Sequence, residues 1–371
     1  MSAATRILHS QQPFTFARGG QLPALELAYE CWGELNAARS NAILIFTGLS
    51  PDAHAASSPE NPEPGWWEFM LGPGKPLDSE RFFVICVNSL GSCKGSTGPA
   101  SLDPATGQPY RLRFPELSLE DIAAATQRVV SALGIEQLFA VVGPSMGGMT
   151  TLAWLQQNPA GARHMISISS AAHAEPFSIA IRSLQREMIV SDPAWQDGAY
   201  SDAQWPEHGM RMARKLGMIS YRSAGEWRER FGRAPQAHYA PRLFGMNFAV
   251  ESYLEAAAER FIGAFDPCCY LYLSRAMDRF DAAAGQASLS TALAPVRLES
   301  ALVLGVDSDV LFPAHQQQEI HHALRAQGVN SQLQVLSSVQ GHDAFLVDSE
   351  TFAHAVSDYL QNLTPQELPQ K

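Results

Sequence analysis

The chain has 371 residues, 46% of them hydrophobic, and is therefore long enough to bury a large core in one elaborated domain or two. Its formal net charge is −11, from 26 basic and 37 acidic residues, and it contains no block of lysines or arginines. This balance disfavours nucleic acid and anionic membrane surfaces as partners, and no apolar run is long enough to span a bilayer.

The cysteine content indicates a reducing environment. The odd count of five, without a repeated spacing, argues against a disulfide framework and predicts reduced, cytoplasmic thiols. Residues 1–18 lack the apolar core of a signal peptide. Neither C-x-x-C nor H-E-x-x-H occurs, so we expect no metal site and no bound cofactor.

The first half of the chain alternates strand-like and helix-like segments. Residues 41–47 and 82–87 are continuous apolar runs rich in β-branched and aromatic side chains, which is typical of buried parallel strands. Residues 119–133 have helical periodicity, with Ser118 as the expected N-cap. A strand, a helix and a second strand are then predicted over 138–142, about 146–157 and 164–169. This rhythm predicts an α/β fold with a doubly wound, mostly parallel sheet.

The alternation stops over residues 175–294. This stretch is rich in arginine and contains helical patterns at 209–216 and 250–261, but no convincing strand. We interpret it as a helical lid inserted into the sheet domain, where it would roof a pocket. Strand patterns resume at 301–305 and 332–336, and a helix pattern closes the chain at 349–360. The predicted catalytic core is therefore discontinuous and comprises 1–174 plus 295–371.

Ser145 carries the most informative motif of the chain. It lies in the sequence Gly-Pro-Ser-Met-Gly, residues 143–147, directly after the predicted strand 138–142. A strand that runs through G-x-S-x-G into a helix is the nucleophile elbow of the α/β-hydrolase fold. The turn needs glycines because Cβ atoms on the neighbouring residues would clash.

An acid and a base follow Ser145 in the order that this fold requires. A serine nucleophile needs a histidine to take its proton and a carboxylate to orient that histidine. Asp309 follows strand 301–305, and His342 follows strand 332–336, so both lie at the carboxyl ends of strands. Asp307 competes with Asp309 as the acid, and spacing alone does not separate the two.

The oxyanion of an acyl-transfer intermediate needs two preorganised backbone N–H donors. Met146, directly after the nucleophile, is expected to supply one of them. The loop after the first inner strand, residues 48–50, would supply the other, and Leu49 is the expected donor.

Several motifs beyond the elbow resemble the homoserine O-acetyltransferase family of α/β-hydrolase-fold acyltransferases. The matching stretches are 65–67 (GWW), 72–75 (GPGK), 91–99 (GSCKGSTGP), the elbow with Gly148 added, 270–278 (YLYLSRAMD), 309–313 (DVLFP) and 341–345 (GHDAF). They run along almost the whole chain. The resemblance implies that Asp309 is the acid of the triad. It further implies that Arg214 and Asp343 hold the amino-acid substrate.

Elementary chemistry agrees with these substrate-binding roles. An arginine can grip an α-carboxylate through two hydrogen bonds, and a carboxylate beside the base can hold an α-ammonium group. The alternative for Arg214 is a solvated charge on the surface of the lid.

Departures from the homoserine acetyltransferase pattern look most like the serine O-succinyltransferase branch of the family. They comprise TGLSPD at 47–52, VNSLGS at 87–92, Pro144 in the elbow and FSIAIRS at 177–183. The last segment places Arg182 early in the lid. A succinyl group brings a free carboxylate into a partly dry pocket, where an unpaired charge is costly. Arg182 is therefore the candidate for acyl-donor specificity, and a salt bridge to an acid such as Glu187 is the alternative.

The acceptor is harder to predict from physical chemistry. Serine and homoserine differ by one methylene, which is worth only ~1–3 kcal/mol of discrimination in a fitted pocket. We expect that difference to be set by the segment that borders the oxyanion loop, namely Leu49, Ser50, Pro51 and Asp52.

The resemblance implies an L-serine O-succinyltransferase that works through an acyl-enzyme in cysteine biosynthesis. Succinyl-CoA and L-serine would be its small-molecule partners, and the family alone implies a homodimer. Homoserine O-acetylation or O-succinylation in methionine biosynthesis is the nearest alternative. A plain esterase and a non-catalytic hydrolase fold are the more distant ones.

Overall fold

The computed structural model describes residues 2–201, 203–236 and 243–363. Its centre is an eight-stranded sheet with the order β1-β4-β8-β5-β9-β10-β11-β12. Neighbours from β8 to β12 pair in parallel, whereas β4 pairs antiparallel with both β1 and β8. The strands are β1 (Arg6–Ser10), β4 (Leu25–Trp32), β5 (Ala42–Phe46), β8 (Phe83–Val87), β9 (Leu138–Pro144), β10 (Ala162–Ile168), β11 (Ser300–Val306) and β12 (Asn330–Leu336). Two small ladders pair β2 (Phe14–Thr15) with β3 (Gln21–Leu22) and β6 (Leu71–Gly72) with β7 (Leu77–Asp78).

The predicted strands are all present, and burial explains why their sequences are continuously apolar. Every residue of β5, β8, β9 and β11 is buried, because helices cover both faces of the sheet. The sequence did not reveal the pair β1 and β4. Exposed and buried positions are mixed in both, so neither reads as a clean strand pattern.

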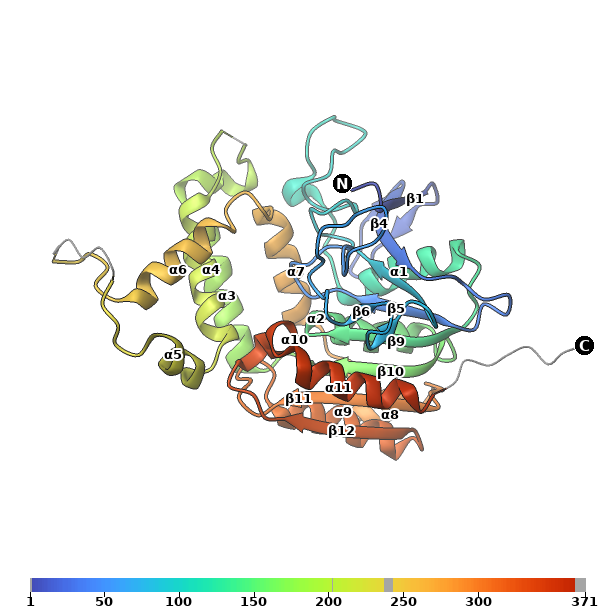
Figure 1. Ribbon diagram of the computed structural model, residues 1–371. Helices are drawn as coiled ribbons and strands as arrows, with labels where there is room; N and C mark the ends of the chain where they lie inside the picture. Colours follow the sequence, from blue (N-terminus) through green and yellow to red (C-terminus); the bar gives the residue numbers. More distant parts are fainter. Residues whose placement is uncertain (1, 202, 237–242, 364–371) are drawn as a thin grey trace, which may run out of the picture.

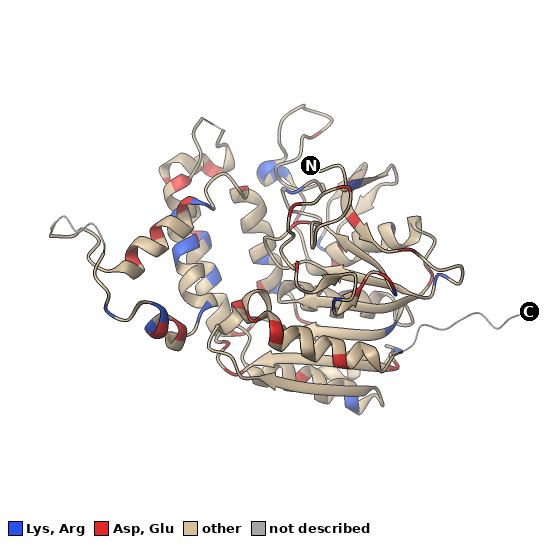
Figure 2. Ribbon diagram, viewed as in Figure 1, with Lys and Arg blue, Asp and Glu red and all other residues tan. Residues whose placement is uncertain are grey.

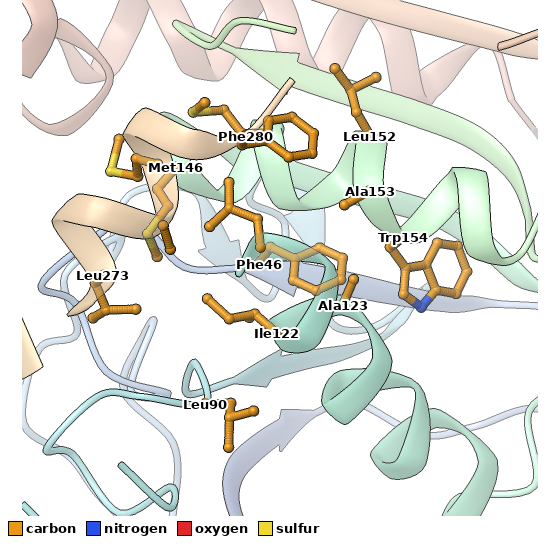
Figure 3. Packing of buried hydrophobic residues seen from close by; sticks show 14 of the residues in the cluster. Phe46, Leu90, Ile122, Ala123, Met146, Leu152, Ala153, Trp154, Leu273 and Phe280 are labelled. Atoms are coloured by element: carbon orange, nitrogen blue, oxygen red, sulfur yellow. The ribbon is translucent and has the colours of Figure 1, made fainter. Parts of the chain in front are cut away.

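Side chains of each inner strand alternate between two hydrophobic clusters. In β9, Leu138 and Val141 join the cluster under α1 (Leu119–Ala132) and α2 (Met146–Gln157). Phe139 and Val142 join the opposite cluster. Figure 3 shows the first cluster, in which side chains of α1, α2 and β5 interdigitate. Further core helices are α9 (Ala314–Ala326), α10 (Ala344–Val347) and α11 (Ser349–Gln361), and α11 contributes to the second cluster.

The N-cap expected at Ser118 is present. Its hydroxyl accepts a hydrogen bond from the Asp121 N–H at 3.2 Å, and the Asp121 carboxylate accepts one from the Ser118 N–H at 2.8 Å. This reciprocal capping box satisfies two donors of the first turn and fixes where α1 begins.

Between β10 and β11 the chain is mainly helical. The helices there are α3 (Pro176–Val190), α4 (Glu207–Tyr221), α5 (Ala224–Phe231), α6 (Ala249–Glu259), α7 (Pro267–Arg279) and α8 (Leu289–Leu293). In Figure 1, α3 to α6 form a group to the left of the sheet, with α7 between that group and the sheet. Figure 2 shows several of the basic residues on α3, α4 and α5. Within the described ranges, no helix combines the length and apolar character needed to cross a membrane.

Candidate active site

Ser145 lies at the turn between β9 and α2, in a strained backbone conformation. Its φ is 54° and its ψ is −124°, which a non-glycine residue rarely adopts. A Cβ on Gly143 would lie 2.3 Å from the carbonyl carbon of Gly147, and one on Gly147 would lie 2.2 Å from the carbonyl oxygen of Phe46. The two glycines therefore let the elbow fold back tightly against β5 and present the serine at the strand end.

The structure brings Ser145, His342 and Asp309 into one hydrogen-bonded chain. The Nε2 atom of His342 lies 2.8 Å from Ser145 Oγ, and its Nδ1 atom lies 2.7 Å from Asp309 Oδ2. All three side chains are buried. This is the arrangement by which a serine hydroxyl loses its proton to a histidine that a carboxylate orients.

Asp309 is held in place by its own loop. Its other carboxylate oxygen, Oδ1, accepts hydrogen bonds from the N–H groups of Leu311 at 2.9 Å and Phe312 at 3.0 Å. Asp307, the competing candidate, is exposed, and its carboxylate accepts a hydrogen bond from the Ser338 N–H at 3.2 Å. The structure therefore places Asp309, and not Asp307, at the imidazole.

Aromatic rings enclose the imidazole of His342. The ring of Phe312 stacks on it at a centroid distance of 4.9 Å, and Phe345 meets it edge-on at 5.5 Å. Tyr221 lies on a further side at 6.2 Å. These rings restrict the imidazole and keep water from its faces, which strengthens the hydrogen bonds of the triad.

Both residues expected to donate to the oxyanion lie beside Ser145. Met146 is the first residue of α2, and its side chain is packed in the core near Leu273 of α7 (Figure 3). This packing holds the amino-terminal N–H groups of α2 in a fixed place. Leu49 lines the same cavity as Ser145.

The acceptor segment is only partly at this cavity. Leu49 is in its wall, whereas Ser50, Pro51 and Asp52 are not among its lining residues. Asp52 instead lines a separate cavity of about 490 Å³, together with Glu30 and His54.

The cavity at Ser145 is small, about 40 Å³, which is room for no more than a few water molecules. Helices α3, α4 and α7 supply most of its wall. The lining residues are Leu49, Ser145, Ile181, Arg182, Gln185, Ser220, Tyr221, Tyr270, Met277, Leu311, Phe312 and His342. Burial raises the pKa values of Tyr221 and Tyr270, so both hydroxyls keep their protons and can donate to a bound group.

Arg182 is 6% exposed and lies in this wall. Its Nε donates to Asp278 Oδ1 at 2.5 Å, so its ion-pair partner is Asp278 rather than Glu187. Its Nη2 is buried and has no hydrogen-bond partner among the described residues. A buried guanidinium with an unused donor, in a wall shared with the nucleophile, is suited to bind an anionic group.

Arg214 and Asp343 lie beside the cavity rather than in its described wall. The Arg214 guanidinium lies 4.5 Å from the ring centroid of Phe261 and 6.0 Å from that of Tyr221, and its buried Nε is without a hydrogen-bond partner in the described ranges. Burial raises the pKa of Asp343, although Arg222, His342 and Arg214 each act to lower it. The site therefore holds charge of both signs next to the triad.

Sequence reasoning missed the partner of Asp343. Arg222 Nη2 lies 3.5 Å from Asp343 Oδ2, and Arg222 Nη1 donates to Glu226 Oε1 at 2.8 Å. Arg222 has extended backbone just before α5, so its pair with Glu226 is not the i,i+4 pair of a single helix that sequence spacing would indicate. The ion pair of Arg222 with Asp343 depends on how the helical region packs against the core. No local sequence pattern indicates it.

Comparison with known proteins identifies the family. The family model described as "alpha/beta hydrolase fold" matches residues 41–349, so the chain belongs to the α/β-hydrolase fold family. The chain is 59% identical over 364 residues to "Serine O-succinyltransferase" of Stenotrophomonas maltophilia, covering 97% of this chain and 98% of that relative. It is 57% identical over 369 residues to "Serine O-succinyltransferase" of Xanthomonas campestris pv. campestris, covering 96% and 97% respectively.

Solved structures agree with this assignment. Homoserine O-acetyltransferase from Bacillus anthracis superposes with a TM-score of 0.89 at 26% identity, covering 98% of this chain and 99% of that one. Esterase E22 superposes with a TM-score of 0.87 at 29% identity, covering 96% and 99%. The predicted fold and the family resemblance are confirmed, and the chain is an acyltransferase.

Proposed function

We propose that this acyltransferase moves a succinyl group from succinyl-CoA to the hydroxyl of L-serine, as the names of its relatives indicate. The observation that carries the proposal is the hydrogen-bonded chain of Ser145, His342 and Asp309, whose first two members line the same cavity as the buried cation Arg182. A serine nucleophile supplies acyl transfer, and a cation within the cavity supplies a reason to prefer an anionic acyl group.

In the first half-reaction, His342 Nε2 accepts the proton of Ser145 as Oγ attacks the thioester carbonyl carbon. Asp309 stabilises the imidazolium that forms. The backbone N–H groups of Leu49 and Met146 stabilise the tetrahedral oxyanion. When the intermediate collapses, the carbon–sulfur bond breaks, CoA leaves with the proton from His342, and the succinyl group remains as an ester on Ser145.

In the second half-reaction, L-serine replaces CoA. Arg214 binds its α-carboxylate and Asp343 binds its α-ammonium group, displacing the contact with Arg222. His342 takes the proton of the acceptor hydroxyl, which attacks the ester carbon. The bond to Ser145 Oγ breaks, Oγ regains a proton from His342, and O-succinyl-L-serine is released toward cysteine biosynthesis.

The closed cavity supports the role of residues 175–294 as a lid over the core of 1–174 plus 295–371. An acyl-enzyme open to solvent would hydrolyse, and the lid helices supply much of the wall around Ser145. A cavity of about 40 Å³ holds neither a succinyl group nor an amino acid. We therefore propose that the lid helices move apart when substrates bind and close again over the acyl-enzyme.

Arg182 is our candidate for donor choice. The terminal carboxylate of a succinyl group would accept a hydrogen bond from its unused Nη2, while Asp278 keeps Nε in place. An acetyl group has no such carboxylate, so Nη2 of Arg182 would gain no hydrogen-bond partner from it.

For the acceptor, we propose that Leu49 contacts the substrate directly. Ser50, Pro51 and Asp52 would act by fixing the course of the loop that carries Leu49. The Asp52 carbonyl accepts a hydrogen bond from Trp66 Nε1 at 3.0 Å, and the Asp52 carboxylate accepts one from the His54 N–H at 3.0 Å. These two contacts anchor at Asp52 the loop that carries Leu49.

We also propose that the enzyme is a cytoplasmic homodimer. Its five cysteines are free thiols, in keeping with a reducing compartment. Exposed apolar side chains are spaced seven residues apart on two lid helices, Phe177 and Leu184 on α3 and Met212 and Ile219 on α4. A second copy of the chain could cover such a two-helix surface by symmetric packing.

The proposal is tested by steady-state assays that cross succinyl-CoA and acetyl-CoA with L-serine and L-homoserine. We expect the highest kcat/KM for succinyl-CoA with L-serine. A clear preference for homoserine would overturn the acceptor assignment and favour the methionine route. The similarity to esterase E22 makes ester hydrolysis the second candidate. Rapid hydrolysis of short esters, unaffected by added amino acid, would support it.

A further inference from the structure

Gln317 is a buried amide that lies behind the triad without touching the reacting atoms. It belongs to α9 and is 0% exposed. Its Nε2 group donates to the carbonyl oxygen of Ser170 at 2.5 Å and to that of Phe312 at 3.2 Å. These two carbonyls belong to different segments, one after β10 and the other in the loop that carries Asp309.

Each of the two carbonyls belongs to a residue that itself contacts the triad. The Ser170 hydroxyl donates to the backbone carbonyl of Ser145 at 2.7 Å. The Phe312 N–H donates to the Asp309 carboxylate at 3.0 Å, and the Phe312 ring stacks on His342. Gln317 therefore bridges the segment that holds the nucleophile and the loop that holds the acid and the base.

A primary amide is suited to this bridge, because one nitrogen carries two donors and both acceptors are carbonyl oxygens. The opposite orientation of the amide would set its oxygen against two carbonyl oxygens. Its Oε1 instead faces Gly305, where a Cβ would lie only 2.6 Å from it, and has no partner among the described residues. The two hydrogen bonds thus set the orientation of the Gln317 amide. The absence of a side chain at Gly305 leaves space for Oε1.

We propose that Gln317 is a positioning residue that fixes the distance between Ser145 Oγ and the His342 imidazole by tying the Ser170 segment to the Phe312 loop. Without it, each segment keeps its own contacts but loses the tie to the other. A misplacement of about 1 Å between reacting groups can lower the reaction rate about a hundredfold. The role rests on the triad proposed above, and nothing in it depends on which acyl group or acceptor is used.

The neighbouring Gln316 offers a matched control. It is 1% exposed, lies on the same helix, and its Nε2 donates to the carbonyl of His173 at 3.1 Å. Its Oε1 is likewise without a partner in the described part of the chain. Gln317→Met and Gln316→Met therefore each remove a buried amide donor, but only the first removes a link between the two triad segments.

The test measures the second-order rate at which methanesulfonyl fluoride modifies Ser145, followed by peptide mass spectrometry, together with kcat, KM and Tm of each variant. We expect Gln317→Met to slow Ser145 modification and to lower kcat by tenfold or more, with KM changed less than twofold. In Gln316→Met the modification rate, kcat and KM should each stay within twofold of the unmodified sequence, although its Tm should fall by about as much as that of Gln317→Met.

Gln317→Glu keeps the volume of the side chain and serves as the second variant if Gln317→Met does not fold. It should slow modification at least as much, because a carboxylate would face two carbonyls. Equal slowing by the 316 and 317 variants, or normal rates in both, would overturn the positioning role. Failure of the unmodified sequence to react at Ser145 would overturn the triad itself, and the positioning role with it.

Discussion

His342 Nε2 and Ser145 Oγ lie 2.8 Å apart although 197 residues separate them in the sequence. The sheet accounts for this meeting. Ser145 follows β9 and His342 follows β12, and the strands from β9 to β12 run in parallel. Their carboxyl ends therefore share one edge, where side chains remote in sequence can form a single catalytic group.

The cation in the cavity wall predicts how the enzyme chooses its donor. Replacing Arg182 with leucine removes the only proposed partner of the succinyl carboxylate, and a charged hydrogen bond is worth about 1.5–3 kcal/mol. We expect kcat/KM for succinyl-CoA to fall by roughly tenfold to a hundredfold, with kcat/KM for acetyl-CoA nearly unchanged.

Arg186→Leu is the matched control for this prediction. Arg186 Nη1 also pairs with Asp278, at 2.6 Å, but Arg186 does not line the cavity with Ser145. An equal loss of succinyl-CoA preference in both variants would show that the ion-pair network, and not contact with the donor, is responsible.

The exposed apolar side chains of α3 and α4 are the basis for a test of the proposed dimer. Ile219→Glu places a charge in the surface that we assign to the second copy, so the dimer should dissociate. Multi-angle light scattering should show the mass change from twice 40.4 kDa to 40.4 kDa. Val335→Glu, an equivalent change at an exposed valine of β12, should leave the dimer intact. A monomeric unmodified protein would refute the dimer.

His164 predicts how stability depends on pH. Its imidazole is buried beside Phe139, and its Nδ1 lies 2.9 Å from Ser300 Oγ. Burial lowers its pKa to about 4, against the opposing effect of Glu299. Between pH 6.5 and 4 the unfolded chain binds a proton that the folded chain does not bind. The free energy of unfolding therefore falls as the pH falls through this window, by up to about 3 kcal/mol.

Urea unfolding at several pH values between 7.5 and 4.5 measures this contribution. In His164→Gln the free energy of unfolding should fall less over this pH range, by about 3 kcal/mol, since glutamine does not titrate. His354→Gln, at an exposed position of α11, should keep the slope of the unmodified sequence. An unchanged slope in His164→Gln would mean that other groups cause the acid sensitivity.

The thiols should differ in reactivity. A hydrogen bond from the Cys269 thiol lowers the pKa of Cys93, and the Asp266 N–H donates to its Sγ at 3.2 Å. Burial raises the pKa of Cys31 to about 12, although both cysteines are half-buried. Because the thiolate is the nucleophile, iodoacetamide at pH 8 should alkylate Cys93 at least tenfold faster than Cys31. Peptide mass spectrometry over time measures both rates, and faster alkylation of Cys31 would contradict the assignment.

The parts of the site that sequence could predict are those with a local signature. The elbow at Ser145 is a short motif with a known turn. The apolar run of β11 and the strand pattern of β12 place Asp309 and His342 at the same edge of the sheet. Choosing Asp309 over Asp307 needed the family resemblance. Only the packed loop shows a physical reason, namely two backbone donors that fix the Asp309 carboxylate.

The parts that sequence could not predict are pairings across packed helices. Arg182 meets Asp278 of α7, and Asp343 meets Arg222 at the end of α4, over separations that no periodicity encodes. The acceptor segment shows a further limit of sequence. The sequence predicts a role for four consecutive residues, but it does not show which of them face the cavity. In the structure Leu49 lines it, and the other three do not.

The covalent succinyl-enzyme can be detected by mass spectrometry of the protein after exposure to succinyl-CoA without any acceptor. We expect one added succinyl group, carried by the peptide that contains Ser145, and its loss when L-serine is supplied. An unmodified Ser145 peptide under conditions where O-succinyl-L-serine is formed would contradict the covalent mechanism.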